Sequence, residues 1–449
     1  MSHSEIAPLT DALLTAAKTA GADAADAIAV DGTSIRIEVL NGALELAERS
    51  EGVELGLRVL VGQRQACVSA SDVEPSTLTE MAERAVAMAR LAPEDPNIGL
   101  ADPDALSDVR DGDALDLNDP GENPDPAGLE ARALEAEAAA LGVQGVSQVS
   151  TAGAAYSRRR IHLAASNGFS GGYARSDHGV FCVAITGEGT GMERDYFGDS
   201  RNHLGDVMSA AEIGRIAGER TVERAGAKKP PTGAYPVIYD ERISSGLIGH
   251  LLSATNGTSI ARGSSWARDL LGEQVLPAHL SLIEEPHRPR TSGSRPFDAE
   301  GLPTRNRAIV ENGVLTGWTL DLATGRKLGM PSTGNASRGT GGPPSPSVGN
   351  ARLTAGDFSR EDLLAQMGTG LLITSMIGSS INATTGDYSR GASGFWVENG
   401  EIAYPVNECT VAGNLKDMLR SIVPANDARP HLSRVVPSLL VEGLTIAGA

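Results

Sequence analysis

The sequence is poor in cysteine and in aromatic residues. Its three cysteines, Cys67, Cys182 and Cys409, are isolated and far apart, which excludes a disulfide framework and fits a reducing cytosol. No run approaches the roughly 20 apolar residues of a membrane span, and no basic segment followed by an apolar one begins the chain. Tyrosine, tryptophan and phenylalanine make up only 4% of the residues. We therefore expect a cytoplasmic protein without an aromatic ligand platform.

Positive charge and metal-binding motifs are also scarce. Lys and Arg number 38 against 57 Asp and Glu, which gives a net charge of −19. An acidic chain repels phosphate backbones, so we expect no nucleic-acid partner. The chain has no Walker A sequence, no CxxC, no HExxH and no HxH, and its eight histidines are scattered. Spacing alone predicts no zinc site, which needs three or four converging ligands.

The patterns that are present predict an α+β fold in several parts. An N-terminal α/β segment with helices and hairpins is followed by an acidic linker, a central mixed segment and a glycine-rich, strand-rich half. Few helices and repeated turns in that last part favour a β-barrel-like antiparallel domain. The predicted boundaries are 1–92 for the N-terminal α+β domain, 93–128 for the Pro/Gly-rich linker, 129–230 for the central domain and 231–449 for the C-terminal domain.

Asn-Gly pairs mark several of the predicted hairpins. One follows the alternating strand at 34–42, another lies at Asn167-Gly168, and two "ENG" turns occur at 311–313 and 398–400. At the start of the helix near residue 75, Thr77 and Glu80 have the spacing of a capping box.

Two local motifs raise the question of catalysis. The stretch "GFSGG" matches the G-x-S-x-G pattern with Ser170 as nucleophile, but a strand pattern follows where a nucleophile elbow needs a helix, so a hairpin explains it better. His250 lies in a predicted helix over 240–257, next to a stripe that includes Leu247 and Leu251. A partly buried core histidine is the simpler interpretation of that position.

The segment Ser332–Asn350 cannot form a regular element because glycines and prolines interrupt it. Long segments of this kind are often functional, and exposed glycine backbone can pair with an extended peptide by strand addition. An ordinary surface loop is the alternative. The candidate peptide-binding residues are Gly334, Asn335, Gly339, Gly341 and Gly342.

Four stretches occur in order within Gly246–Leu419: "GLIGHLLSATNG", "FDAEGLPTRNRAIVENGVLTGWTLD", "GMPSTGNASRG" and "GFWVENGEIAYPVNECTVAGNLKDML". Together they resemble the PmbA/TldD family, once called modulators of DNA gyrase, and its TldE (PmbA) branch in particular. The resemblance is specific there and extends to a three-part layout over the whole chain.

The resemblance implies a cytosolic peptidase made of two kinds of subunit. A TldD-type subunit carries zinc on an HExxxH helix, with a cysteine as a further ligand and the Glu as general base. The complex trims unfolded or extended peptides, such as precursors of ribosomally made antibiotics and labile antitoxins.

In this chain the HExxxH positions align with Ser245-Gly246-Leu247-Ile248-Gly249-His250. Ser245 replaces the first His, Gly246 replaces the Glu, and only His250 remains. The chain is then expected to be the non-catalytic subunit, with no catalytic residue and no metal ligand of its own, while zinc lies in the TldD-type partner. A heterodimer that binds extended peptides, or additionally a homodimer, is implied.

Two alternatives remain at this point. The chain is a hydrolase in its own right, with Ser170 or Ser245 as nucleophile and His250 as base, or with metal ligands from elsewhere such as His279, His287 and His431. Alternatively it is a purely structural scaffold. A shift of one residue in the alignment would also offer Asp240 or Glu241 as an acid.

Overall fold

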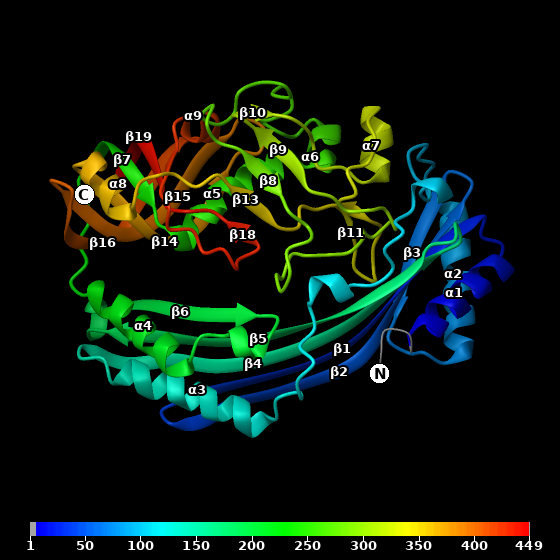
Figure 1. The fold of residues 1–449 in the computed structure, drawn as a ribbon, viewed down its shortest axis with the longest axis horizontal. Helices are drawn as coiled ribbons and strands as arrows, with labels where there is room; N and C mark the ends of the chain where they lie inside the picture. The colour runs from blue at the N-terminus through cyan, green and yellow to red at the C-terminus, as the bar shows by residue number, and fades with distance from the viewer. Residues whose placement is uncertain (1–5, 449) are drawn as a thin grey trace.

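A computed structural model describes residues 6–448 of the protein, as two layers that face one another. One layer is a sheet of long strands backed by helices, built by the first half of the chain (Figure 1). The other is the C-terminal half, which holds a small barrel. Within the described residues, no helix is long and apolar enough to cross a membrane.

The first layer is a six-stranded antiparallel sheet in the order β3-β2-β1-β4-β5-β6. Its central pair, β1 and β4, joins the N-terminal and central segments, because Asp26 to Val39 pair continuously with Ala165 to Ala152. The two segments therefore share one sheet. Its strands are β1 Ala24–Leu40, β2 Ala43–Val61, β3 Arg64–Ala70, β4 Val146–Ala165, β5 Ser170–Thr186 and β6 Glu193–Arg201.

Four helices cover the outer face of this sheet and bury two separate cores. At one end, α1 and α2 pack on β1 and β2; at the other, α3 and α4 pack on β1, β4 and β5 (Figure 1). The opposite face is left for the C-terminal half. The helices are α1 Ala7–Thr19, α2 Pro75–Leu91, α3 Pro126–Leu141 and α4 Ala210–Glu223.

Local sequence signals explain most of these elements. Asn41 and Gly42 both have positive φ, as a two-residue hairpin turn requires, although β1 begins ten residues earlier than the strand predicted at 34–42. The predicted capping box is wrong. Helix α2 begins after Glu74 without a side-chain cap, and the hydroxyl of Thr77 donates instead to Asp72, at 2.7 Å.

The C-terminal half confirms the predicted β-barrel. Strands β16, β15, β14, β7 and β19 are neighbours in that order, and β16 also pairs with β19, which closes a five-stranded barrel. Both "ENG" turns are hairpins, with positive φ at Asn312 and Asn399. The barrel strands are β7 Gly233–Tyr239, β14 Gly370–Ile381, β15 Asp387–Glu398, β16 Glu401–Asn414 and β19 Leu439–Ala447.

The remaining C-terminal elements are short. The helices are α5 Glu241–Ala254, α6 Gly257–Arg262, α7 Leu322–Leu328, α8 Arg360–Met367 and α9 Leu415–Arg420. The strands are β8 Leu282–Glu284, β9 Arg307–Glu311, β10 Val314–Leu315, β11 Ala336–Ser337, β12 Ser345–Pro346, β13 Ala351–Leu353, β17 Val423–Pro424 and β18 Arg434–Val435. The glycine-rich segment 332–350 thus contains only the two-residue strands β11 and β12.

Candidate functional site

Helix α5 follows strand β7 and is capped by Asp240, whose carboxylate accepts a bond from the backbone N–H of Arg242 at 3.2 Å. Leu247 and Leu251 are buried on its inner side. His250 is half-buried, and its ring lies edge-on to Tyr388 with centroids 5.8 Å apart. Ser245 is also half-buried, whereas Gly246 is exposed.

The surroundings of His250 do not favour a metal ion. Burial lowers the pKa of the imidazole, and the nearby positive charge of Arg390 lowers it further. The Nε2 atom is buried without a hydrogen-bond partner among the described residues. A guanidinium beside the ring repels a dication as it repels a proton.

The other donors for zinc are not brought to this helix. The thiol of Cys409, in β16, donates to the carbonyl of Ala392 at 3.2 Å, and burial raises its pKa to about 11, whereas zinc needs a thiolate. Residues 6–448 contain no group of three or more His, Cys, Asp or Glu side chains able to hold a metal. The residues at this position therefore do not fit zinc.

The acids beside α5 are engaged in other contacts. Asp240 pairs with Arg242 at 3.1 Å and with Arg360 at 3.4 Å. Glu241 pairs with Arg429 at 2.6 Å, yet burial raises the pKa of its carboxyl overall. Both carboxylates are therefore paired with arginines. A one-residue shift of the HExxxH alignment would not supply an unpaired base.

Ser170 lies at the start of β5, after the Asn167-Gly168 turn, so "GFSGG" is a hairpin as predicted. The structure gives it a different imidazole from the one expected. Its hydroxyl lies 3.4 Å from Nε2 of His162, and Nδ1 of that ring lies 2.9 Å from the hydroxyl of Thr10. The hydroxyl of Thr10 also donates to the carbonyl of Ala7, at 2.8 Å.

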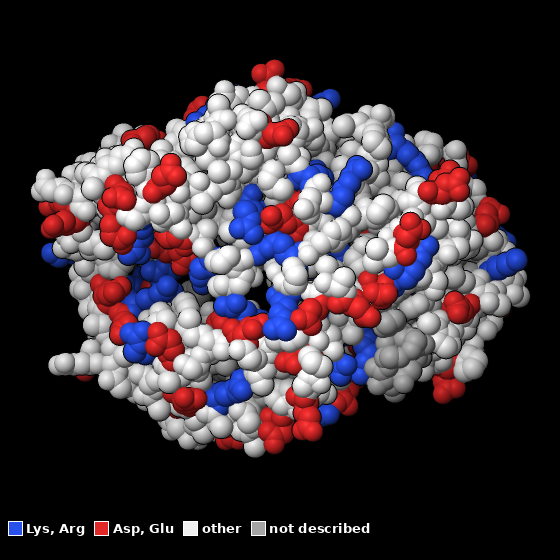
Figure 2. All heavy atoms as spheres, in the orientation of Figure 1, with Lys and Arg blue, Asp and Glu red and all other residues white. Residues whose placement is uncertain are grey.

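Between the two layers lies a cavity of about 830 Å³. Its floor is the inner face of β1, β2, β4 and β5, and its roof is formed by residues 293–295, 297–299, 336–340 and 347–349 of the C-terminal half. Figure 2 shows Lys and Arg interleaved with Asp and Glu along the hollowed seam between the layers. The seam thus carries side chains of both charges.

The five candidate peptide-binding residues divide between the cavity and the packing around it. Gly339 lines the cavity. Asn335 is buried and donates to Glu284 at 2.7 Å, and Gly334 has a φ of 69° where a Cβ would lie 2.4 Å from the carbonyl oxygen of Pro303. Gly341 and Gly342 do not line the cavity; a Cβ on Gly341 would come within 3.8 Å of Ser69.

The glycine-rich segment is anchored to the sheet by a buried ionic cluster. Arg338 from the segment and Arg58 from β2 both pair with Asp26 of β1, and all three side chains are at most 4% exposed. A Cβ on Gly56 of β2 would lie 2.3 Å from the carbonyl oxygen of Thr340, so only glycine permits this approach. The segment is therefore fixed on its sheet side.

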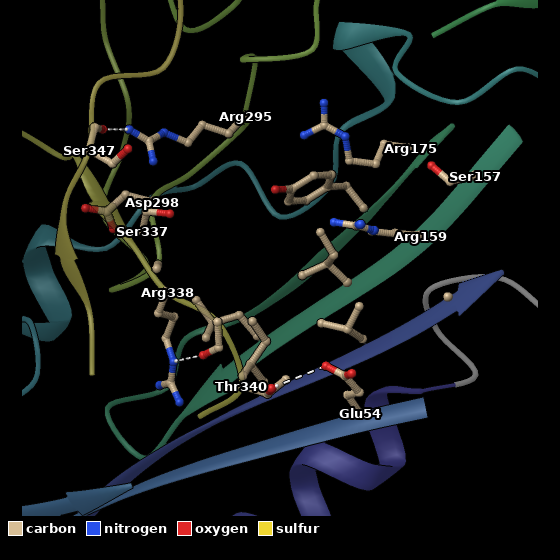
Figure 3. A pocket seen from close by; sticks show the side chains of 18 of the residues that line it. Glu54, Ser157, Arg159, Arg175, Arg295, Asp298, Ser337, Arg338, Thr340 and Ser347 are labelled. Carbon is tan, nitrogen blue, oxygen red and sulfur yellow. Dashed lines mark hydrogen bonds between the residues drawn. The ribbon is translucent and has the colours of Figure 1, made fainter. Parts of the chain in front are cut away.

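Sequence reasoning missed the charged residues of the cavity. Arg159 and Arg175 lie on β4 and β5 and line the floor (Figure 3). The signal for them was the run Arg158-Arg159-Arg160 in an alternating strand, because alternation places the middle arginine on the face opposite its two neighbours. The partner of Arg338 lies more than 300 residues away in sequence and had no local signal.

Comparison of the sequence with protein-family models identifies the family of this chain. Family models match in chain order: PmbA/TldA metallopeptidase domain 1 at residues 25–89, the central domain at 119–225 and the C-terminal domain at 232–448. The chain therefore belongs to the PmbA/TldD metallopeptidase family.

Individual relatives extend over the whole chain. The metalloprotease PmbA of Escherichia coli O157:H7 is 37% identical over 445 residues, covering 98% of this chain and 96% of that protein. A PmbA homologue of Haemophilus influenzae is 36% identical, covering 96% and 94%.

Solved structures share the fold. A proposed modulator of DNA gyrase from Bacteroides thetaiotaomicron has a TM-score of 0.90 at 27% identity, with 98% of each chain covered. TldE from Thermococcus kodakarensis has a TM-score of 0.84, covering 98% of this chain and 100% of that one. At 20% identity the second likeness shows the fold alone.

Proposed function

We propose that this chain is the non-catalytic, PmbA/TldE-type subunit of a cytosolic two-subunit peptidase, in which a TldD-type partner holds the zinc. The observation that carries the proposal is the state of α5. Its one remaining family position, His250, packs against Tyr388 beside Arg390. Ser245 and Gly246 supply neither an imidazole nor a carboxylate there. The names of the relatives as metalloproteases support the peptidase part of the proposal.

In this proposal the chain contributes peptide handling rather than bond cleavage. The cavity between the layers is lined by backbone from the glycine-rich segment and by side chains of four strands, which suits an extended peptide. The segment is held in place by the Asp26 cluster, so it offers a preformed wall. A purely structural scaffold would have no use for such a cavity, and photo-crosslinking of a peptide into residues 334–350 would separate the two roles.

The decisive experiment combines metal content with peptide trimming. The purified chain is analysed for zinc and assayed on an unfolded peptide, alone and mixed with a TldD-type subunit from the same source. We expect no stoichiometric zinc, no cleavage by the chain alone, and cleavage by the mixture that exceeds the activity of the TldD-type subunit alone. Chelator-sensitive cleavage by this chain alone, with bound zinc, would refute the proposal.

A second function, serine-type hydrolysis, is favoured by one observation. The hydroxyl of Ser170 lies near Nε2 of His162, and the hydroxyl of Thr10 contacts the other ring nitrogen. The Ser170 hydroxyl lies 3.4 Å from Nε2, on a hairpin rather than an elbow. A fluorophosphonate probe tests it: labelling that disappears in Ser170→Ala establishes a reactive serine, and absence of labelling rejects it. Ser245 serves as the comparison, since it lies five positions from His250 on one helix and so on a different side of it.

A further inference from the structure

A single row of paired residues crosses the floor of the cavity. Gly52 of β2 is opposite Gly32 of β1, Gly32 is opposite Arg159 of β4, and Arg159 is opposite Arg175 of β5. Directly paired residues point to the same face of an antiparallel sheet. The row therefore presents two bare backbone positions followed by two guanidinium groups.

The two arginines form an unfavourable pair in the protein by itself. Like charges directly opposite one another on a sheet are destabilising. Within residues 6–448, neither guanidinium lies within 4 Å of a carboxylate, and Arg159 makes no side-chain hydrogen bond. Arg175 donates only to the carbonyl of Ser292 in the roof. Arg159 is exposed to solvent and Arg175 is half-buried, so both guanidinium groups can be reached from outside. A pair of cations without a counter-charge at the edge of a cavity is the arrangement that an anionic ligand would neutralise.

The close-up view agrees with this arrangement. In Figure 3, Arg159 and Arg175 project from the green strands into the space below the roof, whereas the guanidinium of Arg295 is turned toward Ser347. Arg295 donates to the Ser347 carbonyl at 2.6 Å and so belongs to the roof. Arg159 and Arg175 are thus cationic groups of the floor that face the cavity.

The row also has an open end. Strand β3 pairs with β2 only from Leu55 to Val61, so at Gly52 the far edge of β2 has no strand beside it among the described residues. A Cβ on Gly52 would meet nothing within 4 Å, and one on Gly32 only a carbonyl at 4.0 Å. Strands lie about 4.8 Å apart, so the row from β2 to β5 spans about 14 Å, the length of about four extended residues.

We propose that this row binds the carboxylate-bearing end of an extended peptide, which crosses the free edge of β2, lies over Gly52 and Gly32, and places its carboxylate between Arg159 and Arg175. The peptide part of this inference rests on the proposed function, whereas the carboxylate site rests on the sheet alone. Planar guanidinium groups suit a carboxylate because they donate two parallel hydrogen bonds.

A nucleic-acid strand is the less favourable occupant. Glu51 and Glu54 of β2 line the same cavity near the open edge, and the chain as a whole carries −19. A polyanion would be repelled along its length, whereas a peptide end with a single carboxylate meets the two arginines after passing the acids. The glycine floor also suits a peptide backbone, which can lie flat where no side chain stands.

Binding to the full chain, without any partner, tests the proposal. An unstructured ten-residue peptide of Gly, Ala and Ser with an N-terminal fluorophore is made as the C-terminal acid, as the amide, and as the amide with one Asp at the last position. Fluorescence anisotropy gives the three dissociation constants. We expect the acid, the Asp form or both to bind at least about tenfold tighter than the amide. The tighter of the two shows whether the site prefers a C-terminal carboxylate or an Asp side chain.

Variants locate the site. Arg159→Gln and Arg175→Gln should each abolish the preference for a carboxylate without lowering the unfolding temperature, because each relieves a like-charge pair. Gly32→Val should weaken all three peptides by covering the floor. The matched control is Arg215→Gln, which removes the same charge from α4, where Arg215 pairs only with Glu212 and Glu219 of its own helix. It should leave all three constants unchanged.

Three outcomes would overturn the proposal: equal binding of the acid, Asp and amide forms, a carboxylate preference that persists in both arginine variants, or displacement of the peptide by a single-stranded oligonucleotide at lower concentration than by unlabelled peptide. Because binding is measured on the chain alone, these outcomes are independent of trimming activity. Failure of the mixture to cleave peptides would overturn the proposed function and leave the carboxylate site standing.

Discussion

Helix α5 and the glycine-rich segment 332–350 were both candidates for function, and the structure places them in opposite kinds of surroundings. Under the proposed function, the family's metal positions on α5 are Ser245, Gly246 and His250, and the His250 imidazole packs on Tyr388. The glycine-rich segment is instead joined to the sheet by a buried ionic cluster and forms the roof of a cavity. Ser245 and Gly246 of α5 carry no charge, whereas charged side chains line the cavity.

Under the proposed function, this difference shows that a chain can lose a metal site and still keep a binding cavity. Metal chemistry depends on a few donors at fixed distances, so two replacements are enough to remove it. A cavity depends on the docking of whole elements, here the Asp26 cluster and the close approach at Gly56, and these are spread over residues far apart in the sequence. Four substitutions test how far the two regions differ.

The largest effect is expected for Asp26→Asn, which leaves Arg58 and Arg338 buried without their shared carboxylate. Removing one partner of a buried ionic cluster costs about 3 to 5 kcal/mol. Urea unfolding would measure it. Asp31→Asn is the control, because Asp31 lies on the same strand, β1, and pairs with a single arginine, Arg160 of β4, with both side chains 15–19% exposed. Its cost should be smaller than that of Asp26→Asn. Equal losses in the two variants would mean that the cluster does not anchor the segment.

A smaller loss is expected for Gly56→Ala. The added Cβ would lie 2.3 Å from the carbonyl oxygen of Thr340, so the segment must move away from β2, at a cost of about 1 to 3 kcal/mol. Gly52→Ala on the same strand is the matched control, since its Cβ meets nothing within 4 Å. Thermal unfolding of both variants distinguishes them. If Gly56→Ala is as stable as the control, the close approach is not part of the anchor.

These two variants also show where sequence reasoning reached its limit. The barrel and the hairpins at Asn41-Gly42 and the two "ENG" turns were predictable, because turn chemistry and alternation act over a few residues. The pairing of β1 with β4 joins residues more than 100 positions apart, and no local pattern specifies it.

The candidate site was less accessible for the same reason. The replacement of donors on α5 could be seen in the sequence once the family resemblance was recognised. The cross-strand row could not, because it needs the register of four strands before Gly52 and Arg175 fall in one line. The partner of Ser170 was predicted as His250, whereas His162, eight residues before it on the neighbouring strand, is the imidazole it meets.

The third prediction concerns pH and the roof of the cavity. Burial raises the pKa of the Asp298 carboxyl to about 6, although the backbone N–H groups of Glu300, Leu302 and Ala336 donate to it and favour its ionised form. Glu300 receives one such bond, from Leu322. Burial, and then the charge of Asp298, raises the pKa of the Glu300 carboxyl well above its usual value of 4.5. Glu300 is therefore the carboxyl that keeps its proton in the folded protein.

The sign of the effect follows from that raised pKa. The folded state binds a proton that the unfolded state releases above pH 4.5, so stability falls as the pH rises from there through the folded pKa. Glu300→Gln should remove the part of this pH dependence that comes from Glu300, which is about 1.4 kcal/mol for each unit by which its folded pKa exceeds the unfolded one. The part that comes from the raised pKa of Asp298 should remain. Urea unfolding between pH 4.5 and 8.5 measures it, with Glu45→Gln, an exposed position of β2, as the control. Parallel slopes in wild type and Glu300→Gln would contradict the assignment of the proton.

The smallest effect is expected for a substitution of His250 on α5. His250→Leu removes a buried Nε2 that has no partner among the described residues and keeps apolar contact with Tyr388, so stability should change by about 1 kcal/mol at most. Peptide trimming by the mixture with a TldD-type subunit should be unchanged. Ser244→Ala, on the same helix, is the control for a lost hydrogen bond, because Ser244 is fully buried and donates to the carbonyl of Val436 at 3.2 Å. If His250→Leu instead abolished trimming at unchanged stability, the imidazole would be acting on the peptide or on the partner's metal, and the division between a binding region and an inert α5 would fail.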